Sequence, residues 1–89
     1  MKRVYCELHM FDLNQIIYIV DPSTGVKEEI AMATMEELPE VITAISNNKQ
    51  IYKVTLSGNS VFGAAVSEDI VAYSKIHYGK QDIEVEVLK

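Results

Sequence analysis

The chain has no tryptophan, one cysteine, two prolines and four glycines among its 89 residues. A single cysteine, Cys6, excludes an internal disulfide and a zinc site built from cysteines. The longest apolar run, at 16–20, is five residues, whereas a membrane span needs roughly 20. No apolar block follows the basic pair Lys2-Arg3, so no signal peptide is indicated. We therefore expect a cytoplasmic protein without a membrane span.

Basic residues are also scarce, because eight Lys and Arg face 13 Asp and Glu and the net charge is −5. Proteins that bind DNA or RNA directly usually present a basic face, since neutralising phosphate dominates their affinity. Here the basic residues are scattered, and only Lys2 and Arg3 are adjacent. The expected partner is therefore another protein or a second copy of the chain, and not nucleic acid.

The first half of the chain is typical of three strands. Apolar residues alternate at Val4, Cys6, Leu8 and Met10, which predicts a strand with one buried face and a buried, inert thiol. Asp12 or Asn14 is expected to supply a left-handed turn residue. The run 16–20 predicts a strand covered on both faces, and the half-polar segment 26–33 an edge strand after the turn at 21–25.

The second half is typical of helix, strand, helix and strand. Thr34 and Glu37 form a capping-box pattern, Pro39 belongs in the first helical turn, and Asn47-Asn48 is the expected stop. A strand is predicted over 51–56, a helix over about 61–78 and a last strand over 83–87. Asn59 or Ser60 is the expected cap of the second helix and Gly79 its stop. Its buried face is predicted to contain Phe62, Ala65, Val66, Tyr73 and Ile76.

The order β-β-β-α-β-α-β predicts one α/β domain, 1–89, with a mixed five-stranded sheet and two helices. This order resembles the ribonuclease H-like fold. The local likeness is best over Tyr52–Leu88, where a strand ends in Gly58-Asn59 and a helix starts with Ser60-Val61-Phe62-Gly63. That stretch is similar to the second half of RuvC-like and phage-terminase-like nuclease domains. In size and style the chain resembles small phage or bacterial proteins.

The resemblance implies where a two-metal nuclease would keep its carboxylates. The first-strand position matches Glu7, and the first-helix position matches Glu37 or Glu40. The position after the fourth strand matches Asn59 or Ser57, and neither is acidic. We therefore expect a non-catalytic domain without metal or cofactor, which acts through protein association, with a homodimer as one form. The alternative is a metal-dependent nuclease or a nucleotide-binding module.

The segment Gly58-Asn59-Ser60-Val61-Phe62-Gly63 is the best local site candidate. It follows a strand and opens a helix, where free backbone N–H groups favour anions. One interpretation is a cradle for phosphate or carboxylate formed by Gly58, Asn59, Ser60 and Gly63. The other is a tight turn with a helix cap, in which Gly63 allows close packing of the helix on the sheet.

Overall fold

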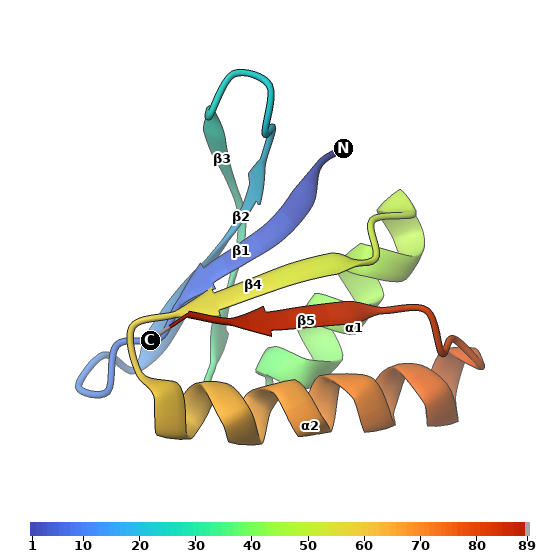
Figure 1. The fold of residues 1–89 in the computed structure, drawn as a ribbon. Coiled ribbons are helices and arrows are strands. Elements are labelled where there is room, and N and C mark those ends of the chain that lie inside the picture. The colour runs from blue at the N-terminus through green and yellow to red at the C-terminus, as the bar shows by residue number, and fades with distance from the viewer. Residues whose placement is uncertain (89) are drawn as a thin grey trace.

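The computed structural model describes residues 1–88, and its seven elements follow the predicted order (Figure 1). The elements are β1 (Arg3–Glu7), β2 (Asn14–Val20), β3 (Lys27–Thr34), α1 (Leu38–Lys49), β4 (Lys53–Ser57), α2 (Ser60–Tyr78) and β5 (Glu84–Val87). The strands form one sheet in the order β3-β2-β1-β4-β5. β1, β2 and β3 pair antiparallel, while β4 and β5 join parallel to β1. The mixed five-stranded sheet is therefore confirmed.

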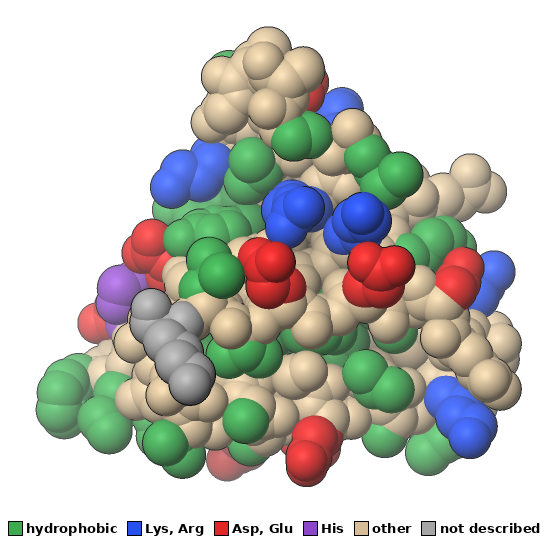
Figure 2. Space-filling view, in the orientation of Figure 1, with side chains coloured by type: hydrophobic (Ala, Val, Ile, Leu, Met, Phe, Trp, Pro, Cys, Tyr) green, Lys and Arg blue, Asp and Glu red, His purple; other side chains and the backbone are tan. Residues whose placement is uncertain are grey.

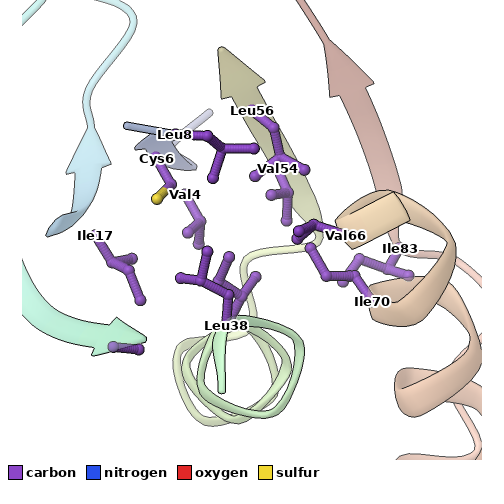
Figure 3. Packing of buried hydrophobic residues seen from close by; sticks show 12 residues of the cluster. Val4, Cys6, Leu8, Ile17, Leu38, Val54, Leu56, Val66, Ile70 and Ile83 are labelled. Atoms are coloured by element: carbon purple, nitrogen blue, oxygen red, sulfur yellow. The ribbon is translucent and has the colours of Figure 1, made fainter. Parts of the chain in front are cut away.

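Both helices pack against the same face of the sheet and against each other (Figure 1). The crossovers β3-α1-β4 and β4-α2-β5 run in the same direction across the sheet, so their right-handedness places both helices on one side. Val4 and Cys6 of β1 and Leu8 just after it point into the core, where they meet residues such as Leu38 of α1 and Val66 of α2 (Figure 3). Met10, predicted on the same buried face, lies beyond β1 and is exposed.

The strand β2 corrects one prediction. Gln15, Ile17 and Ile19 are buried beneath the helices, but Ile16 and Tyr18 are only half-buried on the opposite face. That face carries no helix, because both crossovers lie on the other side. The apolar run correctly indicates an interior strand, between β3 and β1, whereas its coverage on both faces was wrong.

The ends of α1 differ from the prediction in two ways. Thr34 and Glu37 do form the capping box, with Thr34 Oγ1 donating to Glu37 Oε1 over 2.8 Å, but they close a turn before the helix begins at Leu38. Pro39 lies in the first helical turn, as predicted. The left-handed stop is Gln50, at φ 55°, so the prediction of Asn47-Asn48 was wrong. Asparagine is only mildly unfavourable inside a helix, and packing overrides such a preference.

The helix α2 begins after Asn59 and ends at Gly79, in the left-handed conformation with φ 63°, as predicted. Its buried face was predicted less well, because Val66 is buried but Ala65 and Ile76 are exposed. The residues that face the core are Gly63, Val66, Ile70 and Ser74. Gly63 and Ser74 are small, and at Gly63 the helix lies close to the sheet.

The two hairpin turns differ in origin. At 21–25 the carboxylate of Asp21 accepts hydrogen bonds from the backbone N–H and the hydroxyl of Ser23, and Gly25 has φ 71°. Neither Asp12 nor Asn14 is left-handed, so that prediction was wrong: within residues 1–88 Gln50 alone, among non-glycines, has positive φ. The first hairpin loop is instead held by the side chain of Gln15.

Candidate functional site

The turn between β4 and α2 is shaped by Gly58. Its φ is 98°, and a Cβ at this position would stand 2.7 Å from the backbone oxygen of Leu8. β1 and β4 are adjacent, and the Leu8 N–H donates to the Ser57 oxygen over 2.8 Å. The chain therefore turns in a conformation and a space that favour glycine.

Asn59 is the cap of α2. Its Oδ1 accepts hydrogen bonds from the N–H groups of Val61 and Phe62, both at 3.0 Å. These are two of the donors that an anion at this helix end would use. The side chain of Asn59 thus satisfies part of the predicted cradle from within the chain.

Gly63 lies one turn into α2, on its buried face. A Cβ there would stand 2.7 Å from Val87 Cγ1, so Gly63 brings the helix close to β5. Ser60, the fourth predicted residue, is exposed in the first turn. The geometry of Gly58, Asn59 and Gly63 matches the tight, capped turn, and anion binding there stays a prediction.

The carboxylates of the nuclease alternative lie apart. Glu7 points to the helix-free face, where its carboxylate accepts a hydrogen bond from the Tyr5 hydroxyl at 3.1 Å and lies 3.2 Å from His9 Nε2. Glu37 is engaged by Thr34, and Glu40 lies in the first turn of α1 on the other side of the sheet. Over residues 1–88 no three His, Cys, Asp or Glu side chains are grouped to hold a metal ion.

The helix-free face of the sheet is polar and aromatic. Arg3 Nη1 donates to Thr55 Oγ1 over 2.8 Å and lies 3.7 Å from a Glu86 oxygen. Figure 2 shows basic side chains beside acidic ones on this face. Tyr5 bonds Ser57 and lies beneath the Lys27 ammonium, 5.2 Å from its ring centre. The charges on this face are largely matched within the chain.

A shallow groove of about 340 Å³ runs between α1 and α2. Glu36, Glu40 and Asp69 border it, and the rings of Tyr73 and His77, which stack at 4.0 Å, form one wall. The stacking and the place of His77 in the last turn of α2 explain this histidine structurally. We assign it no catalytic role.

The loop between β1 and β2 is the feature that sequence reasoning missed. Gln15 is buried, and its amide accepts from the His9 N–H at 2.8 Å and donates to the oxygens of His9 and Asp12, both at 3.0 Å. The loop so held exposes Met10, Phe11 and Leu13. The sequence contains one signal for this loop, because Gln15 is a polar residue in the same alternating series of β2 positions as the buried Ile17 and Ile19.

Cys6 is buried between β1 and the helices, as predicted. Burial, together with the charge of the neighbouring Glu7, raises the pKa of its thiol to about 12. The reactive thiolate is therefore scarce in the folded protein at neutral pH.

We expect Cys6 to react with iodoacetamide at pH 8 only when the fold opens. The rate should be at least about 100-fold slower than in urea-unfolded protein, where the pKa returns towards its ordinary value. The pKa of the Cys6 thiol is higher in the folded than in the unfolded chain. Cys6 therefore does not weaken the fold below about pH 9, but the free energy of unfolding declines as the pH rises from there towards 12. Mass spectrometry after timed quenching measures the rate, and equal rates in both states would contradict the buried thiol.

None of the helices within residues 1–88 is long and apolar enough to span a membrane.

Comparison with known proteins identified similar structures but no similar sequences. No protein-family model matches the chain, and no curated protein does. The crystal structure of Pelota from Archaeoglobus fulgidus matches 99% of this chain at 14% identity, with a TM-score of 0.59. The match covers 26% of the Pelota chain, so this chain spans about a quarter of its length. Ppx/GppA from Aquifex aeolicus matches at 12% identity over 35% of its chain, with a TM-score of 0.40.

The likeness to the Pelota structure concerns the fold alone. The fold is of the ribonuclease H-like α/β type, as the order of elements predicted.

Proposed function

We propose that this chain is a non-catalytic domain that acts through protein association and forms a homodimer. The observation that carries the proposal is the number of large apolar side chains outside the core, several of them together in the β1–β2 loop. An apolar side chain in water forgoes the free energy of burial, so a cluster of them marks an interaction surface.

The charges of the chain support a protein partner. The net charge of −5 repels phosphate, and the basic residues of the sheet face are close to acids such as Glu84 and Glu86. The separation of Glu7 from Glu37 and Glu40 counts against a shared metal site, on which the metal-dependent nuclease alternative depends. The other alternative, a nucleotide-binding module, would depend on the turn at 58–63 and stays a prediction.

The proposal also includes the family, origin and location of the chain. We infer a kinship with the second half of RuvC-like and phage-terminase-like domains, supported by the turn and helix start at 58–63. A phage or bacterial origin and a cytoplasmic location complete the proposal, supported by the size and composition of the chain.

The proposal predicts that the wild-type chain self-associates at micromolar concentration. Sedimentation equilibrium over a wide range of loading concentrations should show the mean mass rising from 10.0 kDa towards twice that value. The expected interface is of modest area, which is why we expect micromolar and not nanomolar affinity. A mass that stays at 10.0 kDa at every concentration would contradict self-association.

A further inference from the structure

The β1–β2 loop presents apolar side chains on a rigid support. Phe11 is 96% exposed and Leu13 79%, with Met10 beside them. The loop is nevertheless not loosely tethered, because the buried Gln15 amide forms three hydrogen bonds to its backbone, and the Asp12 N–H donates to the His9 oxygen at 3.1 Å. A surface held in one conformation before binding loses less entropy on association.

Further exposed apolar residues lie at the same end of the sheet. The loop leaves β1 where β4 and β5 also end, and Leu88 follows β5 directly (Figure 1). The Leu8 N–H bonds the Ser57 oxygen, which joins the loop to the start of α2, and the Leu88 N–H bonds the Leu56 oxygen. We call the apolar end the exposed apolar residues of the three segments that meet here, which are Met10, Phe11 and Leu13 of the loop, Val61 in the first turn of α2 and Leu88 after β5.

The area of the apolar end matches a small dimer interface. Large apolar residues have on the order of 170 Å² of surface each. With exposed fractions between 43% and 96%, the five residues present roughly 600 Å². Two copies that cover this surface on each other would bury roughly 1,200 Å² in total, the lower end of stable specific interfaces. The largest apolar patch of a typical monomer has about the area of the apolar end, and such patches are often functional.

We infer that the apolar end is the surface through which two copies of this chain associate about a twofold axis. This inference rests on the proposed function and names its surface. The same patch meets itself in such a contact, and homodimer interfaces are the most apolar class. Asp12 lies between Phe11 and Leu13 in the loop, and Glu7 lines the same hollow as Asp12. Two copies therefore bring like charges together, and their repulsion is screened by salt.

The test compares matched pairs of exposed apolar residues by sedimentation equilibrium. The double variant Phe11→Ser with Leu13→Ser removes the centre of the apolar end. The control, Val26→Ser with Ile76→Ser, removes exposed apolar residues elsewhere. We expect the first variant to dimerise at least about 30-fold more weakly, and the control to dimerise as the wild type does. Raising the salt concentration should strengthen wild-type dimers.

The outcomes separate the surface from the function. Wild-type dimers that persist in the Phe11/Leu13 variant, or that are lost only in the control, overturn the apolar end as the interface and leave self-association intact. A monomeric wild type overturns both. Urea unfolding of each variant accompanies the measurement, at a concentration low enough for every chain to be monomeric. Side chains so exposed should then leave the midpoint almost unchanged. If the Phe11/Leu13 variant unfolds early, the salt dependence of the wild type decides: dimers weakened by salt contradict a contact between like charges.

Discussion

Gly58→Ala is expected to lower the free energy of unfolding by about 3 kcal/mol. The added Cβ would have to stand 2.7 Å from the Leu8 oxygen in a backbone with φ 98°. Because the obstructing atom belongs to the backbone of the adjacent strand, it cannot turn away as a side chain would. For a domain of this size the loss corresponds to roughly 15 °C in Tm, which urea titration and calorimetry both measure.

Gly25→Ala is the matched control for that substitution. Gly25 also has positive φ, 71°, but apart from its own atoms and those of its two chain neighbours, no heavy atom of residues 1–88 stands within 4 Å of the place that an added Cβ would take. The expected loss is therefore about 1 kcal/mol, from the left-handed conformation alone. If both alanine variants lost the same stability, the contact between Gly58 and Leu8 would have no energetic role.

Gln15→Leu should cost about 2 kcal/mol of stability and loosen the β1–β2 loop. Leucine fills a similar volume but leaves the His9 N–H and the oxygens of His9 and Asp12 without their partner. Water replaces part of these bonds near the surface, which limits the loss. Urea unfolding measures the stability, and hydrogen exchange at the amides of His9 and Asp12 reports the loop.

The same substitution connects stability with association. A loosened loop must be ordered on binding, so Gln15→Leu should also weaken dimerisation although it removes no exposed apolar atom. The exposed neighbour provides the control, since Asn14→Ala should change stability by less than about 0.5 kcal/mol. A Gln15→Leu chain with protected loop amides would contradict the role of this side chain.

The element order could be predicted because each segment carries its own period and its own stop. The alternation through Val4, Cys6 and Leu8 and the stop at Gly79 are local signals, and both are confirmed. Coverage of the sheet was not a local property. The run at 16–20 could not reveal that both helices pack on one face, because that follows from the direction of the two crossovers.

The candidate site shows the same division. That Asn59 caps α2 could be predicted from residue type and position, although Ser60 was an equal candidate. The hydrogen bonds of Gln15 could not be predicted, because they join its side chain to backbone atoms whose positions depend on the loop. The alternation in the sequence predicted that Glu7 points away from the face of Cys6 and Leu8. The structure places the Glu7 carboxylate on the face that α1 does not reach.

The central place of β1 has a consequence for how the chain folds. β1 pairs with β2 through a short hairpin, but its other edge pairs with β4, where Val4 stands opposite Val54. Nearly two thirds of the chain must therefore be synthesised before the middle of the sheet is complete, because β4 ends at Ser57 of 89 residues. Contacts of such long range slow folding. Until β4 arrives, the β1 edge is an open template for strands of other chains, so the nascent domain is most vulnerable to aggregation at what becomes its best-protected strand.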